Sequence, residues 1–257
     1  MKRLLLLFIF YLLFEQVISA QKENNLFPGE KLTYKIHVGF LHAAEATIKT
    51  AKQAEYVSGK KTHKIEVYGK TVGIFNLLTP VEDYWSANLI PENLLPVKSE
   101  FKKREIRYRK QETVYYNHEK EQARIVSAQN TPTDKIFEIT KQTKDLIGGY
   151  FFLRDQAINQ AKSGQKFTSK ILMDNQLFDL WVIVKGNDTI ENELGRKNCI
   201  RASMVLPKNN LFEDKDAIRI WITDDAYQIP YKIEVGLQFG HLSIDLVDYQ
   251  IAEKKIY

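Results

Sequence analysis

Alternation of apolar and polar residues dominates the chain. Between residues 31 and 38, apolar side chains occupy every second position and polar ones fill the rest. This period of two is that of a β-strand with one buried and one solvated face. The clearest case is residues 229–239, where Gly240–His241 then allows a turn into a return strand. In that return strand the apolar positions shift by one place after Leu246, which predicts a β-bulge.

Two further segments extend this strand pattern. Phe178–Val184 is apolar at nearly every position, so it is expected to be covered on both faces or to line a cavity. Gly186-Asn187-Asp188 is expected to turn the chain back after it. Ile218–Thr223 alternates again, and Asp224–Tyr227 is predicted to form the turn into the next strand.

One segment has the apolar spacing of a helix. In residues 145–161, apolar side chains recur every three or four positions, and Asp145 stands where it can cap the first turn. A shorter apolar segment, Val72–Leu78, is predicted to be a turn of helix or a loop. The fold class that follows is mostly β: a large antiparallel sheet, strongly curved into an open or closed barrel, with one packed α-helix.

The N-terminus has the order of a secretory signal. Lys2 and Arg3 precede an apolar run, Leu4–Phe14, and the small residues near Ala20 offer a cleavage site. The run of about 11 residues is shorter than the roughly 20 that a membrane-spanning helix needs, which disfavours a retained anchor. We therefore predict a signal peptide over residues 1–20 and a periplasmic or secreted chain with no integral membrane span.

Residues 21–257 are predicted to form a single exported β-rich domain. A modest break in the pattern near residues 130–133 suggests two halves that meet near 130–145. The chain has one cysteine, Cys199, so no internal disulfide is available, and its strand-like surroundings predict a buried structural thiol. We expect a monomer.

The formal charge of +5 is compatible with an anionic lipid or an anionic envelope glycan as partner, whereas nucleic acid is not an expected partner outside the cytoplasm. The basic residues gather in one segment. On a single strand, Lys103, Arg107 and Arg109 would share one face and could meet lipid headgroups or glycans. The alternative is a solvated strand face that resists pairing with other sheet edges.

No set of residues in the sequence has a pattern that indicates an enzyme. None of the five histidines forms an H-x-H or HExxH pattern, and there is no G-x-S-x-G elbow or P-loop. Asp224 and Asp225 are adjacent, so they could cooperate only in a turn, where aspartates usually bond their own backbone. The sequence therefore predicts no catalytic residue, no metal site and no cofactor.

Aromatic residues are abundant, with 14 Phe, 13 Tyr and 3 Trp. They supply the core of large β-sheets, but they also line apolar ligand cavities. The candidates for such a lining are Phe151 and Phe152 on the predicted helix and Phe178, Trp181 and Trp221 on strands.

Several of these segments together resemble one family of bacterial exported proteins, the domain of unknown function DUF3108. The resemblance spans most of residues 27–251. It rests on Phe27-Pro28-Gly29-Glu30-x-Leu32-x-Tyr34, Val81-Glu82-Asp83, Leu94-Leu95-Pro96, Tyr150-Phe151-Phe152-Leu153-Arg154, and Ile220-Trp221-Ile222-Thr223-Asp224-Asp225 followed by Ile229-Pro230 and Gly240. One departure is Ala44, where the family usually has a glycine before its acidic residue. The resemblance implies an exported, β-rich envelope protein and supplies no catalytic residues.

Three functional hypotheses follow. The first is a non-enzymatic envelope protein that binds an apolar or amphiphilic ligand, lipid or lipoprotein-like, in a cavity of the curved sheet. The second is an envelope structural or interaction protein that uses the basic strand face. The third is a hydrolase with an Asp/His site, which requires Asp224 or Asp83 to lie in a cleft beside a histidine.

Overall fold

The computed structural model describes residues 24–106, 108–128, 132–205, 217–237 and 240–257. The predicted signal peptide, Arg107 and the break at 130–131 lie outside these ranges. The strands are β1 (Glu30–Val38), β2 (Leu41–Thr50), β3 (Glu55–Val57), β4 (Lys60–Thr71), β5 (Val81–Leu89), β6 (Pro96–Glu105), β7 (Tyr108–Asn117), β8 (Gln122–Ser127), β9 (Thr133–Glu138), β10 (Lys166–Met173), β11 (Gln176–Asn192), β12 (Gly195–Val205), β13 (Ile218–Thr223), β14 (Pro230–Gly236), β15 (His241–Ile251) and β16 (Lys254–Lys255). The helices are α2 (Gly73–Leu78), α3 (Leu146–Arg154) and the 3-10 helix η1 (Ile158–Gln160).

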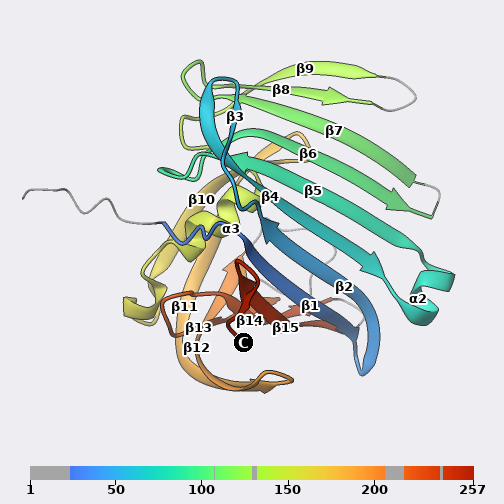
Figure 1. The fold of residues 1–257 in the computed structure, drawn as a ribbon, viewed down its shortest axis with the longest axis vertical. Coiled ribbons are helices and arrows are strands. Elements are labelled where there is room, and N and C mark those ends of the chain that lie inside the picture. Colours follow the sequence, from blue (N-terminus) through green and yellow to red (C-terminus); the bar gives the residue numbers. More distant parts are fainter. Residues whose placement is uncertain (1–23, 107, 129–131, 206–216, 238–239) are drawn as a thin grey trace, which may run out of the picture.

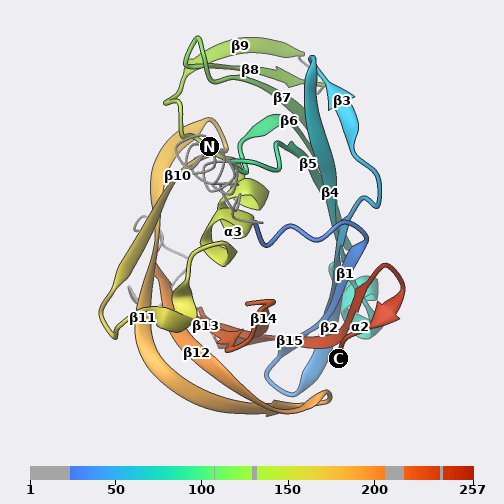
Figure 2. The ribbon, with the colours of Figure 1, turned by 60° about the vertical axis from the view of Figure 1, so that its left-hand side comes forward.

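All long strands belong to one antiparallel sheet, as the alternating pattern predicts. Its order is β10-β11-β12-β13-β14-β15-β1-β2-β4-β5-β6-β7-β8-β9. The first and last long strands of the chain, β1 and β15, therefore pair in the middle of the sheet. Its two edges, β9 and β10, are consecutive in sequence and are joined by the segment that carries α3. Figures 1 and 2 show the sheet curving into a barrel-like shell with α3 inside it.

The segment before α3 covers one of the two sheet edges. The Lys144 N–H donates to the Lys170 carbonyl at 2.8 Å, and the Leu172 N–H donates to the Lys144 carbonyl at 2.8 Å. Lys144 thus forms a short parallel bridge with Ile171 of β10. Because an unpaired strand edge invites association with other strands, this bridge protects part of the open seam.

The predicted bulge in β15 is confirmed, whereas the predicted turn at residues 186–188 is wrong. Thr33 pairs with Asp248 and Tyr34 pairs with Leu246, so Val247 is the extra residue. The strand β11 continues through Gly186 to Asn192, with a register shift against β12 between Val184 and Gly186. Gly186 has φ +121°, a conformation that glycine adopts readily, and it therefore bends the strand rather than ending it.

The predicted helix exists but is shorter than residues 145–161. Asp145 caps it as predicted, with its carboxylate accepting a hydrogen bond from the Gly148 N–H at 2.6 Å. The helix α3 ends at Arg154, and the chain then bends so that the Ile158 N–H donates to the Gln228 side chain at 3.1 Å. The bend carries Ile158 into a separate apolar cluster with Val184, Ile200, Ile220 and Ile222.

The core lies between the inner face of the sheet and α3. Phe151 is fully buried among residues of β4, β5 and the loop after β5, including Ile65, Ala87 and Leu89. Cys199 is buried and free, as predicted, and burial raises the pKa of its thiol to about 12. A thiol with that pKa is a packing residue rather than a nucleophile. Neither α2 nor α3, the α-helices within the described ranges, is long and apolar enough to cross a membrane.

Candidate functional site: a cavity at the start of the inner helix

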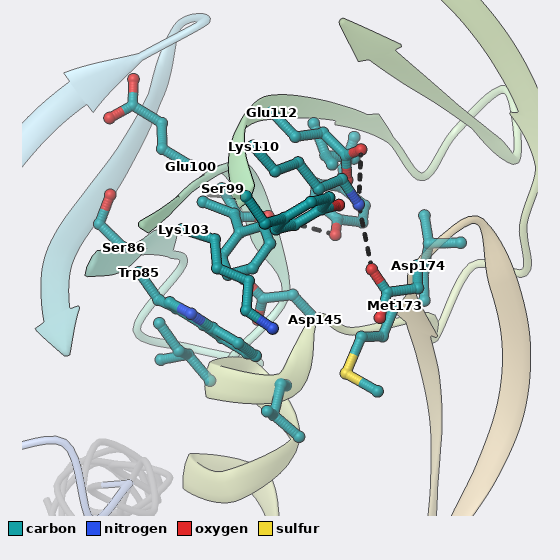
Figure 3. A pocket seen from close by; sticks show the side chains of 17 residues that line it. Trp85, Ser86, Ser99, Glu100, Lys103, Lys110, Glu112, Asp145, Met173 and Asp174 are labelled. Carbon is teal, nitrogen blue, oxygen red and sulfur yellow. Dashed lines mark hydrogen bonds and ion pairs between the residues drawn. The ribbon is translucent and has the colours of Figure 1, made fainter. Parts of the chain in front are cut away.

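A cavity of about 440 Å³ lies at the N-terminal end of α3. Its walls come from the inner face of β5, β6 and β7, the first turn of α3 and the end of β10 (Figure 3). Side chains of Trp85, Lys103, Lys110, Asp145 and Met173 surround it, whereas those of Ser86 and Glu100 point away from it. The volume falls within the range of small-ligand sites, roughly 300–1,000 Å³.

The strand register sorts the wall into rows of different polarity. Asp83, Lys103 and Lys110 are directly opposite one another on β5, β6 and β7 and form a charged row. The next row comprises Trp85, Phe101 and Glu112, and the row after it Ala87, Ser99 and Val114. The cavity wall therefore changes from charged near the β6–β7 turn to mainly aromatic and then mainly apolar toward α3, with the acids Glu112 and Asp145 placed among the aromatic and apolar side chains. This gradient suits an amphiphilic molecule, with a polar end and an apolar body.

Aromatic edges form the middle of the cavity wall. Trp85 and Phe101 meet edge to face, with ring centroids 4.8 Å apart. The ammonium of Lys110 lies 5.6 Å from the centroid of the Phe101 ring, on the cavity side of β7. Rings packed in this way keep their orientation, and they offer a rigid apolar surface to a ligand.

Lys110 is held by two acids on opposite sides of the cavity mouth. Its ammonium lies 3.2 Å from Glu112 on the same strand and 3.0 Å from Asp174 in the β10–β11 turn. Burial alone would lower the pKa of Lys110, but the hydrogen bonds and charges of Asp174 and Glu112 outweigh it and raise that pKa above its usual value. The pair with Asp174 links the two halves of the shell, because β7 and β10 are far apart in the strand order.

Asp145 provides a buried acid at the apolar end of the cavity. Burial raises the pKa of its carboxyl to about 6, although the hydrogen bond from the Gly148 N–H opposes this shift. Its neighbour Lys144 is also largely enclosed, and burial lowers the pKa of that ammonium to about 8. Asp145 therefore changes protonation state within reach of neutral pH.

The other end of α3 is closed by a buried ion pair. Arg154 donates to both carboxylate oxygens of Glu30 at 2.7 Å, and both side chains are about 1% exposed. The Tyr249 hydroxyl donates to Glu30 at 2.8 Å, and the Arg154 Nε–H donates to the Tyr227 carbonyl at 2.8 Å. The ring of Phe27 lies over the guanidinium at 5.3 Å. Because these contacts join α3 to β1 and β15, the cluster fixes the helix to the sheet.

The five aromatic residues that the sequence proposed as a lining are spread over the molecule. Phe151 lies in the apolar cluster beneath α3, and Phe152 packs between that cluster and the one that contains Phe178. Trp181 lies under the Lys166 ammonium, 3.4 Å from its ring centroid. Trp221 packs in a third cluster and donates its indole N–H to Asp188 at 2.8 Å. None of the five lines the cavity at the start of α3, and their role as a lining stays a prediction.

The expectation that the basic residues share one face is wrong for Lys103 and Arg109. The chain turns after Glu105, so that Lys103 pairs with Lys110 and Arg104 pairs with Arg109. Because neighbouring positions of a strand face opposite sides, Lys103 points into the cavity and Arg109 points away from it. Arg107 lies outside the described residues, and the use of these residues as an anionic-surface site stays a prediction.

Two of the aspartates weighed for hydrolysis, Asp225 and Asp83, have structural partners. Asp225 accepts hydrogen bonds from the N–H groups of Tyr227 and Gln228 and from the hydroxyls of Thr223 and Tyr257, which places it in the predicted turn. Asp83 accepts from the backbone N–H of Arg104 at 3.3 Å. In the part of the chain that the structure describes, no group of three or more His, Cys, Asp or Glu side chains could hold a metal ion.

A search that treats each predicted strand separately does not find the cavity residues, because only the pairing register of the strands brings them together. Residues 96–117 contain the signal: Ser99, Phe101 and Lys103 alternate before the turn, and Tyr108, Lys110 and Glu112 alternate after it. Treating this segment as a hairpin would have placed the two sets on one face. The contributions of Asp145 and Met173 come from distant parts of the chain and have no local signal.

The fold and the enclosed helix define a β-barrel-like protein of a single curved sheet. Among solved structures, a beta-barrel-like protein of the domain of unknown function DUF1849 from Brucella abortus is similar, with a TM-score of 0.54 and 8% identity over 89% of this chain and 99% of that chain. A candidate exported protein with a YmcC-like fold from Bacteroides fragilis gives a TM-score of 0.32 at 9% identity over 91% of this chain and 100% of that chain. The first similarity supports the barrel-like fold, and the second is too low to support an argument.

The family is shown by the sequence itself. The family described as protein of unknown function (DUF3108) matches residues 33–247, and the chain belongs to it. This confirms the resemblance drawn from the sequence motifs. The sequence has no match among curated proteins. The family is of unknown function, and no enzymatic activity is indicated for it.

Proposed function

We propose that this protein is exported and binds an amphiphilic small molecule, without catalysis, in the cavity at the start of α3. The observation that carries the proposal is the polarity gradient of the cavity wall. A charged row that includes Lys103 and Lys110 stands at the mouth, and Trp85, Phe101 and Val114 follow toward the helix. A ligand with a polar head and a single apolar chain or ring system matches this order.

The position of the cavity supports binding rather than packing. Core side chains pack closely around Phe151 and Leu153 of α3, whereas the first turn of the helix borders a cavity of about 440 Å³. Water in a space with aromatic walls is displaced favourably by apolar groups. The predicted signal peptide supports an exported location, where amphiphiles of the cell envelope are available.

Native mass spectrometry of the protein purified from an envelope fraction tests the proposal first. We expect a discrete added mass that organic solvent releases. Titration with cis-parinaric acid, a fluorescent single-chain fatty acid, then tests the site. We expect saturable binding that Val114→Trp weakens by about tenfold or more, because the indole occupies the cavity.

The matched control is Thr113→Trp. Thr113 is the neighbour of Val114 on β7 and faces the opposite side of the sheet, so the same indole added there leaves the cavity open. A bare protein mass together with no saturable binding of the probe would contradict the proposal. Equal loss of binding in the two variants would place the ligand elsewhere.

A further inference from the structure

The helix α2 has no buried residue although its sequence is Gly-Ile-Phe-Asn-Leu-Leu. Leu77 is 81% exposed, and Ile74 and Leu78 are also mainly exposed. Short helices gain little stability from propensity and normally bury an apolar face. Packing within the described part of the chain therefore does not explain why the side chains of α2 are apolar.

Two neighbouring turns present apolar side chains beside α2. Phe40, in the β1–β2 turn, is 91% exposed, with Leu41 next to it, and Ile106 in the β6–β7 turn is also exposed. The three elements are connected, because the Val72 N–H donates to the Ala43 carbonyl at 2.9 Å and the Ile106 N–H donates to the Pro80 carbonyl at 3.0 Å. Figure 1 shows α2 and the β1–β2 turn at the same end of the sheet.

We define the apolar rim as the exposed apolar residues of these three elements: Phe40, Leu41, Ile74, Leu77, Leu78 and Ile106. These are six of the thirteen exposed large apolar side chains in the described part of the chain. Exposed apolar side chains scattered singly are ordinary, but a contiguous group marks an interaction surface. At the opposite end of β4, the β3–β4 turn and the short strand β3 carry a single one of them, Tyr56.

Cations stand directly behind the apolar rim. Arg104 and Arg109 are exposed and lie opposite each other on the outer face of β6 and β7. Like charges in this position are destabilising, and Glu82 lies near Arg104 at 3.8 Å. Among the described residues no carboxylate forms an ion pair with Arg109. Lys70 adds an exposed cation at the end of β4, between Glu45 of β2 and Glu82 of β5 in the register.

A hollow of about 330 Å³ lies between α2 and the two arginines. Asn76, Pro80 and Ile106 form its apolar and amide side, and Glu82, Arg104 and Arg109 form its charged side. An anionic headgroup placed there would meet two guanidinium groups and one carboxylate, that of Glu82, with the apolar rim beside it. This arrangement of apolar tips in front and cations behind is that of proteins that insert into a membrane interface.

From this arrangement we propose that the apolar rim docks on an anionic lipid bilayer, with Arg104 and Arg109 at the level of the headgroups. Charge complementarity favours a lipid surface over a second copy of the chain, because two copies would bring four arginines together. The orientation of the cavity also agrees with docking on a bilayer. Its charged row is at the same end of β5, β6 and β7, so docking would place the cavity mouth next to the bilayer.

Vesicle flotation of the processed, exported protein tests this docking. The probes are vesicles of phosphatidylcholine alone and of phosphatidylcholine mixed with phosphatidylglycerol. We expect binding to the mixed vesicles that weakens with added salt. The pair Phe40→Ser with Leu77→Ser should lower the partition coefficient by at least about tenfold. Arg104→Glu with Arg109→Glu should lower it by about tenfold in mixed vesicles and little in phosphatidylcholine.

The matched control is Tyr56→Ser with Ile136→Ser, which removes two side chains that are 77% and 67% exposed but lie away from the apolar rim. Circular dichroism shows which variants are folded. Unchanged binding in this control supports the docking surface. Absence of wild-type binding to the mixed vesicles overturns it, as does an equal loss in the control. A wild-type dimer in light scattering that dissociates only in the rim variant, without vesicle binding, would assign the rim to a second copy. The outcome does not depend on whether the cavity holds a ligand.

Discussion

The two ends of α3 differ in how completely their charges are compensated. At the C-terminal end, Arg154 and Glu30 are both buried and share two hydrogen bonds, with Tyr249 and the Tyr227 carbonyl completing the set. At the N-terminal end, Asp145 is buried beside an open space; it accepts a hydrogen bond from the Gly148 N–H and interacts with the Ser99 hydroxyl and the Lys144 charge, but no cation forms a close ion pair with it among the described residues. The helix is therefore anchored at one end and borders a cavity at the other.

This difference between the two ends of α3 assigns stability to one end of the helix and the proposed ligand binding to the other. A buried ion pair with all partners in place rigidifies a structure, and it strongly destabilises the fold when one partner is removed. A buried acid next to a cavity titrates near neutral pH and leaves room for another molecule. A protein that must hold an inner helix while leaving space beside it needs both arrangements.

The largest expected effect comes from breaking the closed end. Arg154→Met leaves the Glu30 carboxylate buried and unpaired, so the free energy of unfolding should fall by about 3–5 kcal/mol. Urea denaturation measures this loss. The control is Lys35→Met, which breaks the exposed ion pair with Glu193 and should cost about 0.2–1 kcal/mol.

The double variant Glu30→Gln with Arg154→Met sharpens the same comparison. With both charges removed, no unpaired ion remains, and part of the loss in Arg154→Met should be recovered. Strictly additive losses would mean that the two side chains contribute through separate contacts, and the ion pair would not be the anchor.

At the open end, the second prediction concerns pH. The pKa of Asp145 is about 6 in the native state, against an ordinary value of 3.8 for an aspartate carboxyl. The native state thus binds the proton more tightly, so stability falls as pH rises through this window, by at most about 3 kcal/mol. Asp145→Asn retains a capping side chain but removes the titration, and its stability should change less between about pH 4 and pH 7.

The measurement is the difference between the wild-type and Asp145→Asn urea curves across pH. Taking the difference removes other titrating groups such as His118, whose pKa burial lowers. The Lys144 ammonium, with a pKa of about 8, contributes in a separate range at higher pH. A difference that does not vary with pH would show that Asp145 is no less ionised in the fold than in the unfolded chain.

The elements of the sheet were predictable because each one depends on a local pattern. Strict alternation gave the strands around Leu32 and Ile220, and the one-place shift after Leu246 gave the bulge. Asp145 was identified as a cap for the same local reason. The turn predicted at Gly186 was wrong although a glycine followed by Asn and Asp is typical of a turn. Here the positive φ of Gly186 bends a long strand, β11, which continues along β12.

The cavity and the anchor were not predictable because they join residues far apart in sequence. Glu30 and Arg154 lie within two segments that carry the family resemblance, but only the fold shows that they pair. The aromatic side chains of Phe151 and Trp221 pack in two different apolar clusters. The cavity instead uses Trp85, which had no distinguishing signal beyond its neighbours.

A smaller effect tests how closely the first turn of α3 approaches β10. A Cβ added at Gly149 would lie 2.4 Å from Cδ1 of Ile171, which is fully buried. Gly149→Ala should therefore destabilise the fold by about 1–3 kcal/mol through overpacking, offset by up to about 1 kcal/mol of helix propensity. Adding Ile171→Val removes Cδ1, and thermal or urea unfolding should show that the double variant is more stable than the sum of the two changes implies. Additive losses would mean that another neighbour limits the approach.

The smallest expected effect comes from the cavity mouth, with a substitution matched to the one at the closed end. Lys110→Met removes a paired cation, as Arg154→Met does, but the two acids that pair with Lys110 are placed differently from Glu30: Asp174 is exposed and Glu112 borders the cavity. Water in the cavity can hydrate the Glu112 carboxylate, so the free energy of unfolding should fall by only about 1 kcal/mol. Urea denaturation of both methionine variants under identical conditions makes the comparison. A loss as large as that of Arg154→Met would show that the mouth is an anchor too, and that the link between β7 and the β10–β11 turn holds the shell closed.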